Sequence, residues 1–159
     1  SATHTSTIHS IETTGTTMDT CLIMDSTITA VSHPGPTSYE AESPTNLITN
    51  DTELQNCSDC SGGFKIGFIG FEEELTFENI NGDTGGTFPL TIYFATGEDR
   101  VGDISINNGA PIVINYYNTS SFVHVNSTTV SVVLCAGSKN TIKFYNPTNY
   151  TADIDRIVV

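Results

Sequence analysis

Residues 88–117 read FPLTIYFATGEDRVGDISINNGAPIVINYY, and this stretch decides the fold class. Runs rich in β-branched and aromatic residues recur in it at 88–95, 103–107 and 112–117. Asn107-Asn108-Gly109 separates the last two runs and is a typical turn sequence. Short strands joined by tight turns are typical of a sandwich or barrel, whereas strands alternating with helices would indicate a parallel sheet.

The same pattern extends on both sides of this stretch. Further turn sequences stand at Gly62-Gly63, Asn81-Gly82-Asp83 and Gly85-Gly86, and no segment has a convincing helical pattern. The sequence therefore predicts one all-β domain over residues 39–159. The predicted strands are Tyr39–Ser43, Phe64–Ile69, Glu74–Ile80, Phe88–Ala95, Asp103–Asn107, Ile112–Tyr117, Val130–Cys135, Thr141–Tyr145 and Asp153–Val159.

The first 38 residues differ in character from this domain. Residues 1–17 are rich in Ser and Thr, and residues 18–31 alternate with period two, which predicts an isolated β-strand within an extension over 1–31. Residues 32–38 contain two prolines and a glycine, which favours an extended linker. The apolar face of the predicted strand carries Met18, Leu22, Met24, Ile28 and Ala30.

Charge and hydropathy exclude several classes of partner. Five Lys and Arg stand against eighteen Asp and Glu, a net charge of −13, so nucleic acid and anionic membranes would be repelled. No apolar run reaches the length of a membrane span. Five N-glycosylation sequons predict a secreted, extracellular glycoprotein that carries covalent N-glycans, at Asn50, Asn56, Asn118, Asn126 and Asn149.

The four cysteines allow three pairings, and a secreted chain permits disulfides. Cys57 and Cys60 are close enough to pair across a short turn, which leaves Cys21 with Cys135. The second bond would either close a loop of more than 100 residues within one chain or link two chains.

The two ends of the predicted domain carry motifs that resemble those of a known family. Tyr39-Glu40-Ala41-Glu42 opens the domain, SGGFKIGFIG follows at 61–70, and Asn146-Pro147 precedes DIDRIVV at 153–159. The whole stretch is similar to the carbohydrate-binding modules of families 35 and 6. This resemblance implies a jelly-roll β-sandwich.

The resemblance also implies a structural calcium ion held between the two ends of the domain. The ligands it implies are Glu40, Glu42, Asp153 and Asp155. Because side chains alternate along a strand, Glu40 and Glu42 share one face, and so do Asp153 and Asp155. Four carboxylates meeting at one edge would repel one another unless a hard cation such as calcium bound their oxygens. The alternative is that these carboxylates are solvated strand ends.

Modules of this kind often stack a sugar ring on exposed aromatic side chains, commonly Trp, and this chain has no Trp. The resemblance places Tyr150 and Phe122 at the corresponding positions. Both residues lie beside sequons, so the sugar site of the family would here be replaced, or covered by glycans. The alternative is that the two rings are ordinary loop or core aromatics.

Catalytic residues are not evident. Glu72-Glu73-Glu74 is a charge run typical of a solvated face, and the four histidines are scattered. The chain is therefore predicted not to be an enzyme.

The predicted N-terminal strand leads to the functional hypothesis. An unpaired apolar strand can enter the sheet of a neighbouring molecule by β-strand addition. The chain then resembles a subunit of an extracellular glycoprotein fibril, a head-to-tail homopolymer built by strand donation. The alternative is a calcium-dependent carbohydrate-binding module of a secreted glycoside hydrolase, with a polysaccharide as its partner.

Overall fold

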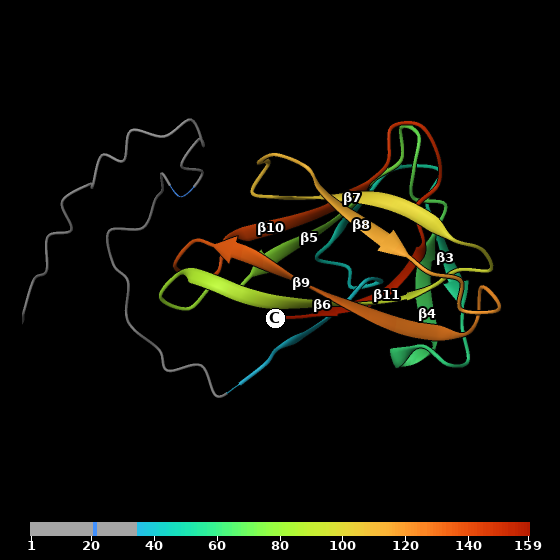
Figure 1. The fold of residues 1–159 in the computed structure, drawn as a ribbon. Helices are drawn as coiled ribbons and strands as arrows, with labels where there is room; N and C mark the ends of the chain where they lie inside the picture. Colours follow the sequence, from blue (N-terminus) through green and yellow to red (C-terminus); the bar gives the residue numbers. More distant parts are fainter. Residues whose placement is uncertain (1–20, 22–34) are drawn as a thin grey trace, which may run out of the picture.

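The computed structural model describes residue 21 and residues 35–159 (Figure 1). Two antiparallel sheets lie over each other, one in the order β3-β4-β11-β6-β9 with β1 also paired to β11, the other in the order β2-β5-β10-β7-β8. The strands are β1 (Ser38–Glu40), β2 (Leu47–Ile48), β3 (Glu53–Asn56), β4 (Phe64–Gly67), β5 (Leu75–Ile80), β6 (Gly86–Ala95), β7 (Arg100–Ile106), β8 (Ile112–Tyr116), β9 (Val125–Leu134), β10 (Asn140–Tyr145) and β11 (Asp153–Val158).

The core lies between the two sheets and follows from the period-two pattern. In β10, Ile142 and Phe144 are fully buried while their neighbours along the strand are half-buried. Phe144 meets Phe77 of β5 edge to face, with ring centroids 5.6 Å apart. The predicted all-β jelly-roll sandwich is confirmed, and apart from the short 3₁₀ turn η1 (Ser61–Gly63) the described residues contain no helix.

The two short strands β2 and β3 are missing from the prediction. β3 consists of Glu53-Leu54-Gln55-Asn56 and has no alternating apolar face. It forms because its backbone pairs with β4, from Glu53 opposite Gly67 to Asn56 opposite Phe64. Backbone pairing with β4 thus makes a strand of a segment whose own sequence has only a weak preference for β-structure.

Most of the predicted N-terminal extension lies outside the described residues, including Met18, Leu22, Met24, Ile28 and Ala30. Within the predicted linker, Thr37 exchanges backbone hydrogen bonds of 2.7 and 3.0 Å with Val159. The antiparallel pairing of β1 with β11 therefore begins at Thr37.

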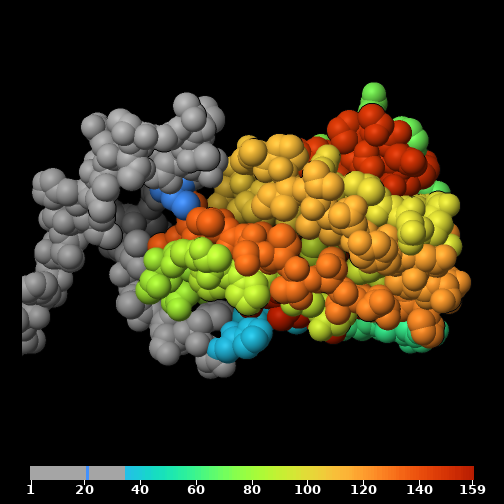
Figure 2. Space-filling model, viewed as in Figure 1, coloured from blue at the N-terminus to red at the C-terminus, as the bar shows by residue number. Residues whose placement is uncertain are grey.

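Two disulfides are present, with the pairing that the sequence predicts. Cys57 and Cys60 pair across a turn, and Cys21 pairs with Cys135 of the same chain, with their Cα atoms 5.1 Å apart. Figure 2 shows the surface of the described residues, with β6 in yellow-green beside its partner β9 in orange. Nowhere in residues 35–159 is there a helix of the length and hydropathy needed to span a membrane.

Candidate functional site

Three of the carboxylates predicted as metal ligands gather where β1 meets β11. Glu40 ends β1 and Glu42 follows it, while the N–H of Ala41 donates to the carbonyl oxygen of Asp155 at 2.9 Å. Glu40 Oε2, Glu42 Oε2 and Asp155 Oδ1 are buried, and within residues 35–159 none of these oxygens has a hydrogen-bond partner. Such oxygens are costly to bury unless a proton or a cation satisfies them.

The η1 turn closes this carboxylate cluster. Ser61 Oγ donates to Glu40 Oε1 at 2.7 Å. Gly62 has a φ of +65°, and a Cβ at this position would lie 2.8 Å from Glu42 Oε1. The left-handed backbone therefore favours glycine at this position, where it also leaves room for the Glu42 carboxylate.

Burial and mutual repulsion change the pKa values in the cluster. Burial raises the pKa of Asp155 from 3.8 to about 6, and the charge of Glu40 adds to this effect. Burial also raises the pKa of Glu42, again with a contribution from Glu40. Calcium accepts six to eight oxygen ligands, so this donor set suits it chemically. However, no three His, Cys, Asp or Glu side chains within residues 35–159 already surround a single point as metal ligands would.

Asp153, the fourth predicted ligand, does not join the cluster. Its carboxylate forms a buried ion pair with Lys65, whose ammonium also donates to the carbonyl oxygen of Phe122. β11 has a bulge at Asp155, because Ile154 faces Phe94 of β6 while Arg156 already faces Tyr93. The sequence predicts Asp153 and Asp155 on one face of the strand, and this prediction is wrong. A bulge changes the direction in which the side chain of its extra residue points.

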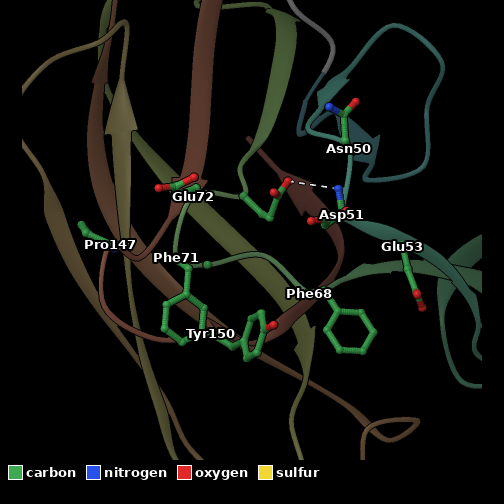
Figure 3. Close-up of a pocket in the computed structure, with 10 residues that line it drawn as sticks. Asn50, Asp51, Glu53, Phe68, Phe71, Glu72, Pro147 and Tyr150 are labelled. Atoms are coloured by element: carbon green, nitrogen blue, oxygen red, sulfur yellow. Dashed lines mark hydrogen bonds between the residues drawn. The ribbon is translucent and has the colours of Figure 1, made fainter.

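A second feature is an open pocket of ≈ 760 Å³ formed by the loops that follow β2, β4 and β10 (Figure 3). Its floor carries the ring of Tyr150 between those of Phe71 and Phe68, with ring centroids 4.9 and 5.7 Å from Tyr150 and both contacts edge to face. Phe68 is 43% and Phe71 50% exposed. The lining residues are Asn50, Asp51, Glu53, Phe68, Gly70, Phe71, Glu72, Glu73, Pro147 and Tyr150.

The backbone around this pocket is strained and closely packed. Phe68 and Phe71 have φ values of 57° and 59°, which are rare for bulky residues. Gly70 lies between them and pairs with Glu73 and Tyr150; a Cβ on Gly70 would come within 2.2 Å of the carbonyl oxygen of Asn149. This contact fastens the 68–73 loop to the 146–150 loop and keeps the three rings together.

Comparison with solved structures decides the family. A family 35 carbohydrate-binding module from Clostridium thermocellum is 32% identical, with a TM-score of 0.72, and the match covers 76% of this chain and 96% of that one. The chain belongs to family 35 of the carbohydrate-binding modules. No family model and no curated protein matches it.

Two enzymes contain a similar segment. An exo-β-1,3-galactanase from Phanerochaete chrysosporium, solved with galactose, is 30% identical with a TM-score of 0.72, over 80% of this module and 30% of the enzyme. A Podospora anserina β-(1,4)-mannanase, described as GH26-CBM35, is 26% identical with a TM-score of 0.65, over 79% of this module and 27% of the enzyme. The module thus spans less than a third of either enzyme.

The two aromatic residues that the resemblance implies for sugar stacking lie in different surroundings. Tyr150 lies in the aromatic pocket, whereas Phe122 does not line it. Arg100 and Lys65 stack against the Phe122 ring, at 4.8 and 5.6 Å from its centroid, and a Cβ on Gly97 would come within 2.7 Å of its edge. Phe122 therefore acts as packing over the buried Lys65.

Phe68 and Phe71 are not among the site residues that the sequence predicts, and the Glu72-Glu73-Glu74 run is interpreted there only as a solvated face. Glu72 and Glu73 line the pocket, while Glu74 pairs with Lys143 at 3.2 Å. The signal that could have revealed the loop is Phe68-Ile69-Gly70-Phe71, in which a glycine interrupts an aromatic run.

Proposed function

We propose that this chain is a non-catalytic module of an extracellular protein that binds a polysaccharide in the pocket of Phe68, Phe71 and Tyr150. One observation carries the proposal: two bulky rings are held exposed at positive φ beside a third ring in one pocket. Backbone strain of this kind persists where the surrounding structure enforces it, and it clusters at ligand sites. The three rings meet edge to face, so the apolar face of a pyranose can stack on one ring while the others flank it.

Three further observations support a binding role outside the cell. The module matches only a part of each of the two enzymes, whose remaining length holds other segments. The disulfides fit an oxidising compartment. The side chains of all five sequon asparagines are exposed, which is compatible with covalent N-glycans.

Titration calorimetry with β-1,3-galactotriose and β-1,4-mannotriose tests the proposal, because these sugars correspond to the two enzymes. Phe71→Ala and Tyr150→Ala are expected to weaken binding at least about 10-fold, equivalent to about 1.4 kcal/mol. Tyr117→Ala is the matched control, because Tyr117 is 70% exposed and lies outside the pocket. Equal losses in all three variants, or no binding by a wider panel of neutral glycans, would contradict the proposal.

We also propose that calcium binds Glu40, Glu42 and Asp155 as a structural ion. Support comes from three buried oxygens of these residues that have no hydrogen-bond partner within residues 35–159, and from Ser61 and Gly62, which pack against the cluster. The ion would fix the start of β1 against β11 at the edge of the sandwich. Isothermal titration of the chelator-treated protein with calcium measures this binding directly, and an unchanged Tm with and without chelator would contradict it.

The fibril subunit remains a prediction. Apart from Cys21, its proposed donor strand lies outside the described residues. Cys21 pairs with Cys135 within one chain, so this bond requires no neighbouring molecule. Electrophoresis without reductant separates the two cases, because a ladder of bands would mean linkage between subunits and a single monomer band would mean closure within the chain.

A further inference from the structure

The wall of the aromatic pocket carries one sign of charge. Its ten lining residues include four carboxylates and not one Lys, Arg or His. Glu73 Oε2 accepts a hydrogen bond from the N–H of Asp51 at 3.2 Å, drawn dashed in Figure 3, and another from the hydroxyl of Thr49. Glu53 and Glu72 lie on either side of this pair in the close-up. The negative charge is therefore built from several loops and is not a single exposed side chain.

The basic side chains of the module are engaged or distant from this pocket. Lys65 is buried against Asp153, and Arg100 binds Glu98 at 2.9 Å. Lys143 binds Glu74 at 3.2 Å, and Arg156 of β11 stacks on Tyr93 of β6. Lys139 is exposed in the loop between β9 and β10. A ligand entering the pocket thus meets carboxylates with no neutralising protein cation among the lining residues.

The aromatic floor adds to this preference. The face of an aromatic ring is the negative part of its quadrupole and attracts cations within about 6 Å of the ring centroid. Phe68, Phe71 and Tyr150 offer three such rings at the base of the carboxylate wall. The rings and the carboxylates therefore both favour a positively charged group, whereas a uronic acid would be repelled by the wall.

We propose that the pocket selects sugars carrying a protonated amino group, such as a deacetylated 2-amino-2-deoxyhexose, over neutral sugars, and that it rejects uronic acids. This inference rests on the proposed function, since it concerns the charge of the sugar that stacks on the three rings. The amino group would lie against the carboxylates while the pyranose stacks on one ring of the aromatic floor.

The test compares oligosaccharides of equal length by titration calorimetry at pH 6 and low salt. The three probes are a glucosamine hexamer, an N-acetylglucosamine hexamer and a galacturonic acid hexamer. The glucosamine hexamer is expected to bind at least tenfold more tightly than its acetylated form, with no binding of the uronate. In 1 M salt the ratio is expected to fall towards one, because exposed charges are then screened beyond about 3 Å.

Two double variants test whether the preference for glucosamine comes from the carboxylates of the pocket wall or from the net charge of −13 on the whole chain. The double variant E53Q/E72Q removes two carboxylates from the pocket wall, and E78Q/D83N removes two that do not line it. We expect the glucosamine preference to fall several-fold in the first variant only. Tyr150→Ala should weaken binding of the glucosamine hexamer at least about 10-fold. An unchanged affinity would mean non-specific attraction and would overturn the proposal.

The remaining outcomes distinguish this inference from the proposed function. Equal binding of the acetylated and deacetylated hexamers refutes the charge selection and leaves the sugar-binding role intact. Uronate binding that appears on addition of calcium also overturns it, because the carboxylates would then hold a metal ion and not an amine. If no charged or neutral glycan binds, both proposals fail.

Discussion

Asp155→Asn should make the calcium-free protein more stable and at the same time remove its response to calcium. Burial and the neighbouring Glu40 raise the pKa of Asp155 from 3.8 to about 6. The folded state therefore holds this proton more tightly than the unfolded state. Stability is lost as the pH rises from about 4 to about 6, because the unfolded chain ionises there at less cost.

The pKa difference sets the size of the effect. A shift of about two units, at 1.36 kcal/mol each, corresponds to about 3 kcal/mol of destabilisation once the carboxylate is ionised. Asparagine cannot ionise, so Asp155→Asn should recover up to about 3 kcal/mol at pH 7 in chelator. At roughly 2 to 4 °C per kcal/mol, this is a rise in Tm of roughly 6 to 12 °C.

Thermal unfolding by calorimetry, with chelator and with excess calcium, measures both effects. At pH 7 the variant should unfold at the higher temperature in chelator and the wild type at the higher temperature in calcium, because a ligand that binds the folded state stabilises it. At pH 4 the two proteins should converge. Glu78→Gln is the control, because it makes the same chemical change outside the cluster. A variant less stable than the wild type in chelator at pH 7 would refute the reasoning.

Three further substitutions test other parts of the molecule. Lys65→Met leaves the buried carboxylate of Asp153 without its partner and should lower the free energy of unfolding in urea by about 3–5 kcal/mol; a loss below about 1 kcal/mol would speak against a buried pair. Asn149→Gln, made in a glycosylating host, should bind sugars more tightly than the wild type, because a glycan beside Tyr150 would cover the pocket; equal affinities would show that it does not. Cys21→Ser opens a loop spanning 114 residues, and the chain-entropy model gives a loss of about 4–5 kcal/mol in urea unfolding; an unchanged midpoint would contradict closure within the chain.

The sandwich was predictable because strand alternation and turn residues are local signals. In β10 every second residue is buried, so the pattern that predicts the strand also predicts its inner face. β2 and β3 were not predictable in this way. β2 has two exposed residues and β3 has none that are buried, so both exist only because a neighbouring strand offers backbone partners.

The carboxylate cluster was predictable in part for a similar reason. The motifs at the two ends of the domain indicated that Glu40, Glu42 and Asp155 would meet, and the antiparallel pairing of β1 with β11 brings them together. The bulge at Asp155 was not visible, because a bulge adds one residue without any change in the apolar pattern. Alternation therefore assigned Asp153 to the cluster although it pairs with Lys65.

The pocket was missed because the strongest local signal at its edge was misleading. Phe64, Ile66 and Phe68 alternate as a strand would, yet β4 ends at Gly67 and Phe68 turns into the left-handed region. Strain of this kind costs on the order of 1–3 kcal/mol for each residue. The close backbone packing of Gly70 against Asn149 and Tyr150 must therefore offset this cost. A loop that only had to close the sandwich would do so at lower cost with Gly or Asn at both positions. Two exposed phenylalanines in their place are therefore better explained by a ligand than by folding.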